Sequence, residues 1–173
     1  MWDADVWTAI GTWVILVPTA ITLIVQHRQT RLVHAHETLL TLQERWSSPD
    51  FRARRRSLAA ALLAQKGISE DNCETASFFE TMGILLRRKA LDEELVWNEF
   101  GYAIISYHGA MTMGRNDLKV IRDASDDQNV FAEFDALATR VLRRDARKRH
   151  RNLVDVKPSL SAIREYLESE AAE

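Results

Sequence analysis

The sequence has a single cysteine, Cys73, and only three prolines and six glycines among its 173 residues. One cysteine cannot form an internal disulfide, and this usage agrees with a reducing compartment. With so little proline and glycine the chain has no low-complexity linker, and it shows no internal repeat. These absences favour one compact domain with its own core.

Motifs that carry catalysis are also missing. There is no glycine-rich phosphate loop, no GxSxG sequence and no kinase signature. His34 and His36 are two residues apart and so point to different faces of a helix, which does not suit a metal site. Cys73 has no basic neighbour that would favour a reactive thiolate. We therefore expect no catalytic residue, no metal and no cofactor.

Two glutamates, Glu80 and Glu99, lie in segments that are rich in apolar residues. A buried carboxylate pair could perform acid–base chemistry together with a histidine. Glutamates are rarely buried, however, so the favoured interpretation places them on the surface or beside Arg87 and Arg88. An enzyme is the last of the function classes that we expect.

Charge is absent from residues 6–25, which read VWTAIGTWVILVPTAITLIV. Twenty helical residues span about 30 Å, the thickness of the hydrocarbon core of a bilayer. A cleaved signal peptide fits less well, because Asp3 and Asp5 precede the apolar run and no Lys or Arg does. We predict a single-pass transmembrane helix over 6–25.

All 23 Lys and Arg residues follow this apolar run, with Arg28 and Arg31 nearest to it. The positive-inside rule then places residues 1–5 outside and the C-terminal domain in the cytoplasm, at the inner or plasma membrane of the cell. Of the 25 acids only Asp3 and Asp5 precede the run, so the part after it is formally neutral. A general attraction to nucleic acid is not indicated.

The segment 26–46 has the periodicity of a helix that continues out of the membrane as a stalk. Apolar residues spaced by three and four positions form a short seam: Leu32, Ala35, Leu39, Leu42 and Trp46. Because the seam is too short for a convincing coiled coil, we expect it to pack on its own domain. Self-association through the seam is the alternative.

The remaining residues show helical periodicity and no sustained period-two alternation, so the predicted fold class is all-α. Ser48, Pro49 and Asp50 together predict a helix start, and Asp92 predicts a second one. Beyond the stalk we predict a bundle of about five helices, with a central antiparallel hairpin. The predicted helices cover 51–65, 74–88, 92–108 and 117–123, a loop covers 109–116, and Asp126 or Asp127 caps a longer helix.

We divide the part after the stalk into a cytoplasmic domain over 47–151, a linker over 152–158, and an amphipathic helix with an acidic tail over 159–173. The strongest functional signal lies at the end of the domain, where seven basic residues surround a single acid, Asp145. The seven are Arg140, Arg143, Arg144, Arg147, Lys148, Arg149 and Arg151.

A basic stretch of this kind binds anionic lipid headgroups, an acidic protein surface or nucleic acid phosphates. Aromatic residues that could stack on bases are absent from it, which disfavours nucleic acid. The alternative is internal pairing with the acids of the C-terminal tail, which are Glu165, Glu168, Glu170 and Glu173.

A second basic segment contains Arg52, Arg54, Arg55 and Arg56. Arginines near the start of a helix oppose its dipole, so they are expected either to pair with acids or to face a partner. The favoured interpretation is a solvated face with some salt bridges. These four residues form the second candidate patch.

The segment SFFETMGILLRRKALDEELVWNEFGYAIISYH, with RWSSPDFRARR upstream, resembles a bacterial family of uncharacterised, single-pass, membrane-anchored helical proteins. The similarity covers Trp46 to His108, and Lys89-Ala90 stands where the family has glycine before the leucine. It implies the same topology and assigns no catalytic residue. The matching positions are Phe78, Phe79, Glu80, Leu91, Asp92, Leu95, Phe100 and Gly101.

We therefore expect a non-enzymatic, membrane-tethered cytoplasmic module that binds a protein partner or a second copy of itself. The alternative is a membrane-surface sensor or effector that binds anionic lipid through residues 140–151. A nucleic-acid-binding module held at the membrane ranks below both.

Overall fold

The computed structural model describes residues 22, 26, 30, 33–66, 68, 73–113, 117–150 and 152–172. The predicted transmembrane helix over 6–25 lies outside these residues except for Thr22. Within the described ranges, no helix is long and apolar enough to cross a membrane.

The described residues form helices and contain no strand, which confirms the all-α fold class. Residues 33–47 are helical and form the part of the predicted stalk that the structure describes. The elements that follow are α2 (Pro49–Leu63), α3 (Glu74–Arg87), α4 (Glu93–Thr112), α5 (Asp117–Ser125), α6 (Ala132–Arg149), α7 (Leu153–Val156) and α8 (Leu160–Ala172).

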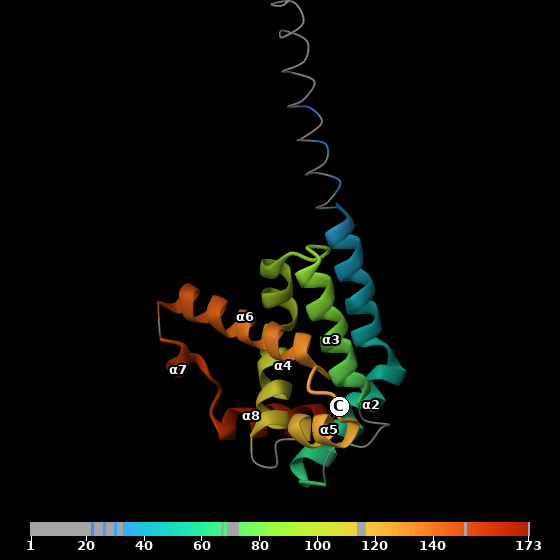
Figure 1. The fold of residues 1–173 in the computed structure, drawn as a ribbon, viewed down its shortest axis with the longest axis vertical. Coiled ribbons are helices and arrows are strands. Elements are labelled where there is room, and N and C mark those ends of the chain that lie inside the picture. The colour runs from blue at the N-terminus through green and yellow to red at the C-terminus, as the bar shows by residue number, and fades with distance from the viewer. Residues whose placement is uncertain are drawn as a thin grey trace, which may run out of the picture.

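Two helices, α6 and α8, cross the others and hold the bundle together (Figure 1). α3 and α4 run in opposite directions, and α6 crosses and packs against both of them. α8 lies across the other end of the domain and packs against α2 and α4. α3 and α4 run antiparallel, as the predicted central hairpin requires, but the main packing partner of each is α6.

The stalk packs on its own domain, as predicted. Ala35, Leu39 and Leu42 are buried. The indole of Trp46 lies 5.4–5.8 Å, between ring centroids, from four phenylalanines of α2, α3 and α4. The described part of the apolar seam, from Ala35 to Trp46, thus packs on the domain and is not a free surface for a second copy.

The two predicted helix starts are confirmed. Ser48 Oγ accepts a hydrogen bond from the Phe51 backbone N–H at 3.3 Å, with Pro49 as the first residue of α2. Asp92 Oδ1 accepts from the backbone N–H groups of Glu94 and Leu95 at 2.8 and 3.2 Å. Each side chain satisfies N–H groups that the first turn of a helix leaves unpaired.

The predicted loop over 109–116 is wrong in its first part, because α4 continues to Thr112. Gly109 lies against α8, where a Cβ at that position would approach Ile163 Cδ1 to 2.6 Å. Packing against α8 holds this glycine in the helix despite its low helix propensity.

The start of α6 also differs from the prediction. Asp127 accepts a hydrogen bond from Asn129 N at 2.8 Å within a turn, and α6 begins only at Ala132. The carboxylate of Glu80 on α3 instead accepts from the backbone N–H of Phe134 at 2.7 Å. A side chain from another helix therefore satisfies the first turn of α6. The predicted linker over 152–158 contains the short helix α7.

Candidate functional site

The basic residues at the end of α6 lie over the first turn of α4. Arg144 and Lys148 contact Glu94 at 2.9 and 3.0 Å, and Arg144 also lies 3.7 Å from Glu93. The hydrogen bond and positive charge of Lys148, then the charge of Arg144, lower the pKa of Glu94. Both glutamates also lie in the first turn of α4, where the helix dipole favours negative charge. The positive charge of Arg144 and Lys148 is therefore neutralised within the domain.

Arg149 is paired as well, with Asp145 one turn earlier on the same helix at 2.9 Å. Lys148 in addition places its ammonium 4.3 Å from the ring centroid of Trp97, a cation–π contact. Three of the predicted partner-binding residues, Arg144, Lys148 and Arg149, are therefore occupied by contacts inside the domain.

Arg140, Arg143 and Arg147 are spaced by three and four positions, so they form one strip along α6, which we call the open arginine face. This strip adjoins the one that carries Arg144 and Lys148. Together with Glu93, His150 and Asn152 the three arginines line an open depression of about 850 Å³. Within the described ranges Arg140 and Arg143 have no ion-pair partner, and Arg147 has one long contact, 3.4 Å to Glu93. Arg151 lies outside the described residues.

The predicted internal pairing with the C-terminal tail is not the one observed. The acids that neutralise the basic stretch come from α4 and from α6 itself. In the tail, Glu168 pairs with Arg164 at 2.9 Å and Glu170 contacts Arg55. The reason is topological: the end of α6 crosses α4, whereas α8 lies against α2 (Figure 1).

Arg55 was predicted to belong to the second candidate patch, but the structure places it in the interior. Only 4% of this residue is exposed, and its Nη1 lies 2.6 and 2.5 Å from the two carboxylate oxygens of Glu170 on α8. Its guanidinium carbon also lies 4.0 Å from the ring centroid of Trp46. Arg55 falls four residues after Phe51 and three before Leu58, so the helical period that predicted the apolar stripe of α2 could have placed it in the core.

Two tyrosines complete the surroundings of Glu170. Tyr166 and Tyr107 donate hydrogen bonds to its carboxylate at 2.9 and 3.2 Å. Burial, followed by the charge of Glu170, raises the pKa of the Tyr166 phenol, so that hydroxyl stays protonated and donates. The buried acid is thus held by one arginine and two hydroxyls, which is a structural arrangement that joins α2, α4 and α8.

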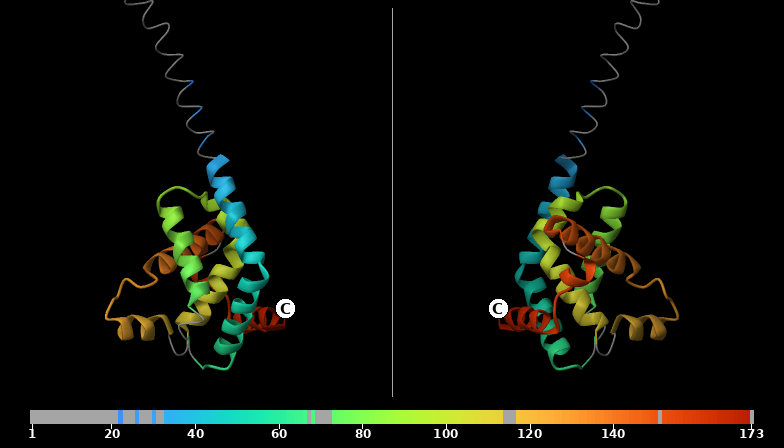
Figure 2. Two further views of the ribbon diagram at one scale, coloured as in Figure 1. Left: turned by 90° about the vertical axis from the view of Figure 1, so that its right-hand side faces the viewer. Right: turned by 90° about the vertical axis from the view of Figure 1, so that its left-hand side faces the viewer.

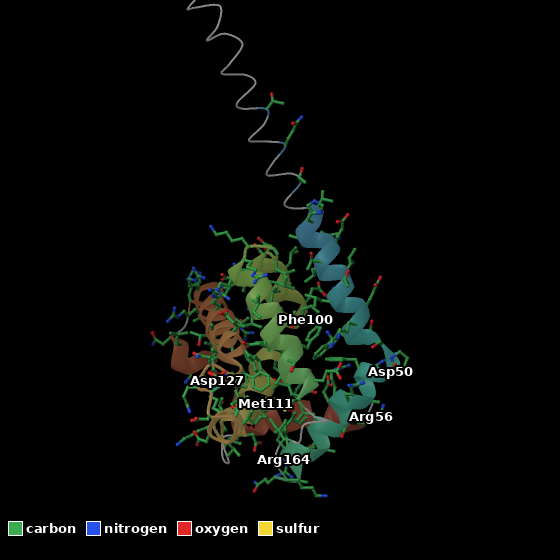
Figure 3. The ribbon with its side chains drawn as sticks, turned by 45° about the vertical axis from the view of Figure 1, so that its right-hand side comes forward. Asp50, Arg56, Phe100, Met111, Asp127 and Arg164 are labelled. Carbon is green, nitrogen blue, oxygen red and sulfur yellow. The ribbon has the colours of Figure 1, made fainter. Side chains whose placement is uncertain are left out.

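The other arginines of the second candidate patch are at the surface. Arg54 pairs with Glu74, which also accepts a hydrogen bond from Arg45 at 3.0 Å. Arg52 and Arg56 are exposed and have no ion-pair partner in the part of the chain that the structure describes. Figure 3 shows Arg56 at the outer edge of α2 and Phe100 in the interior.

The two glutamates considered for acid–base chemistry are not brought together. Glu80 is bound to the start of α6, and Glu99 accepts a hydrogen bond from Gln43 of the stalk at 2.7 Å. No group of three or more His, Cys, Asp or Glu side chains in the described segments could hold a metal ion.

A polar cluster that the sequence did not predict joins α4, α5 and α6. Asp135 accepts from Arg122 at 2.5 Å and lies 2.8 Å from His108 Nε2. Burial alone would raise the pKa of Asp135, but the hydrogen bonds from His108 and Arg122 together lower it. Because Arg122 also donates to the Val130 carbonyl at 2.8 Å, the cluster fixes the turn before α6.

Residues 3–141 match a family model described as a domain of unknown function, DUF4760, and the chain belongs to this family. The match reaches into α6 and ends before α7 and α8. No curated protein and no solved structure matches the chain.

Proposed function

We propose that this chain is a membrane-tethered, non-catalytic helical module, and that its domain binds a negatively charged partner through the open arginine face of α6. In this proposal residues 6–25 span the inner or plasma membrane of a bacterial cell. Residues 1–5 lie outside and the helical domain lies in the cytoplasm.

The division of the basic residues along α6 carries the proposal. On one side of the helix, Arg144 and Lys148 are neutralised by the acids of α4. On the adjoining strip, Arg140 and Arg143 border a depression that Glu93 also lines, and neither forms an ion pair with a described residue. Glu93 already contacts Arg144 and Arg147, so the positive charge of Arg140 and Arg143 is in excess of the acid that lines the depression.

Two further observations support the proposal. The seam residues from Ala35 to Trp46 pack on the domain, so the contact that we propose is with another molecule and not between two stalks. Glu80 and Glu99 each make a hydrogen bond that supports a helix or the stalk, which leaves them no shared site for acid–base chemistry.

The test is purification of the full chain in mild detergent, with and without nuclease, followed by identification of what co-elutes and of the complex mass. We expect an anionic partner with the wild-type chain and its loss from the Arg140→Ala/Arg143→Ala variant. Arg52→Ala/Arg56→Ala is the matched control, because it removes the same charge from exposed arginines of α2. A chain that captures nothing, or equal capture by both variants, would contradict the proposal.

A further inference from the structure

We infer that the open arginine face binds the phosphate groups of anionic lipids in the membrane to which the chain is tethered. This inference rests on the proposed function and names its partner. The domain would then fold back onto the bilayer, with Arg140, Arg143 and Arg147 at the headgroups.

The position of α6 supports a lipid partner. Its C-terminal end lies in the half of the domain from which the stalk leaves, in Figure 1 and in both views of Figure 2. The predicted membrane helix precedes the stalk and ends at Val25, so only residues 26–32 separate it from the described helix. Seven residues reach at most about 25 Å even when fully extended, so the stalk end of the domain stays near the predicted membrane.

A second basic segment lies at the same end of the domain. The turn between α3 and α4 is next to the stalk in Figure 2, and the side chain of Arg88 in that turn is exposed. The far end of the domain, where α8 lies, carries paired charges such as Arg164 with Glu168. The stalk end of the domain therefore carries an exposed arginine besides the open arginine face, and Arg52 and Arg56 of α2 are exposed arginines elsewhere on the domain.

The shape and composition of the face also favour headgroups over a protein. The depression is wide and open, and Glu93 lines it together with the arginines. Its apolar lining residues are Ala146 and Leu153, and Leu153 is 44% exposed. Tight protein contacts depend on aromatic or aliphatic anchors that fill well-packed pockets, and this face has none of them. At the boundary between headgroups and acyl chains, arginines can contact phosphates while a neighbouring apolar side chain contacts the acyl chains.

The expected affinity of the open arginine face for anionic lipid is modest, but it is sufficient for a tethered domain. A basic residue near an anionic leaflet strengthens association by roughly fivefold, so three arginines give on the order of a hundredfold. A domain without the tether would bind anionic lipid only weakly with a gain of this size. The tether holds the domain beside the bilayer at high effective concentration, so a weak contact becomes largely occupied.

The test uses the full chain in lipid nanodiscs of phosphatidylcholine alone or of phosphatidylcholine mixed with phosphatidylglycerol. A dye on Thr139→Cys, in a Cys73→Ser background, reports energy transfer to dye-labelled headgroups. We expect higher transfer in the anionic discs and a decrease as salt is raised. Arg140→Ala/Arg143→Ala/Arg147→Ala should reduce transfer to the value in neutral discs, whereas Arg52→Ala/Arg56→Ala should leave it unchanged.

Equal transfer in the two lipids, or equal transfer by the triple variant and the wild type, overturns the inference. If lipid has no effect while the Arg140→Ala/Arg143→Ala variant loses a co-purified acidic protein, the proposed function stands and the lipid inference falls. If carbonate extracts the wild-type chain from membranes, both fall, because the tether is then absent.

Discussion

On α2, Arg55 is 4% exposed and contacts both carboxylate oxygens of Glu170, whereas Arg140 and Arg143 on α6 border an open depression without an acid partner in the described segments. All three are arginines of amphipathic helices in arginine-rich surroundings. What differs is the neighbour that crosses each helix. α8 covers α2 at Arg55, while nothing described covers α6 at Arg143, so position relative to a crossing helix decides whether an arginine supports the fold or stays available.

The largest effect is expected from breaking the buried pair. Arg55→Ala leaves the carboxylate of Glu170 buried without its cation, and Glu170→Ala leaves the guanidinium in the same condition. Loss of one partner of a buried ion pair costs about 3–5 kcal/mol of unfolding free energy. Urea denaturation of the full chain in detergent, followed by helical circular dichroism, measures this cost.

The control for that prediction replaces both partners at once. Arg55→Met/Glu170→Leu removes the two charges together and keeps similar volumes, so it should recover most of the stability that either alanine variant loses. Equal loss in the double variant would show that Tyr107, Tyr166 and Trp46 need the charges themselves, and would contradict this account of the pair.

A smaller effect is expected from the paired side of α6. Arg144→Ala and Lys148→Ala each remove one cation from an exposed acid, so each should destabilise the domain by less than Arg55→Ala does. The same denaturation experiment ranks the three variants. If Arg144→Ala lowers the unfolding free energy by as much as Arg55→Ala does, the proposed difference between the paired arginines of α6 and the buried arginine of α2 is wrong.

The pH dependence of those variants provides their control. Because the folded-state pKa of Glu94 is lowered, the stabilisation from its cations is fully present above its ordinary pKa of 4.5 and is lost as the pH falls through the lower folded value. The stability difference between wild type and Lys148→Ala should therefore be present at neutral pH and shrink in acid. A difference that persists at the acid limit would argue for lost packing on Trp97 instead.

The smallest effect on stability is expected from the open face. Arg140→Ala/Arg143→Ala breaks no ion pair of the described residues, so the unfolding free energy should change by no more than about 0.5 kcal/mol, as for Arg52→Ala/Arg56→Ala. The two variants should then differ only in partner binding. A large loss of stability in the first would place these arginines among the residues that hold the fold.

Much of the fold follows from local chemistry. The all-α class, the starts at Ser48 and Asp92 and the packing of the stalk were predictable, because caps and the helical period act within a few residues. The start of α6 was not predictable, because the carboxylate of Glu80, on another helix, accepts the hydrogen bond from its first turn. The end of α4 was missed for a similar reason, because Gly109 stays helical where Ile163 packs on it.

The candidate site was predictable only in outline. Periodicity places Arg140, Arg143 and Arg147 on one strip of a helix and Arg144 and Lys148 on the adjoining strip, but it does not say which strip meets acids. That depends on α6 crossing the first turn of α4, where Glu93 and Glu94 lie. For Arg55 the period was informative, yet its partner, Glu170, lies 115 residues further along the chain.

That separation has a consequence for how the protein is made. The ribosome adds about 5–20 residues per second, so Glu170 is synthesised on the order of ten seconds after Arg55, 115 residues earlier. A chain that stops after α6 contains every residue matched by the family model and still lacks the carboxylate that Arg55 contacts. The buried ion pair therefore forms only after the C-terminal helix has been synthesised.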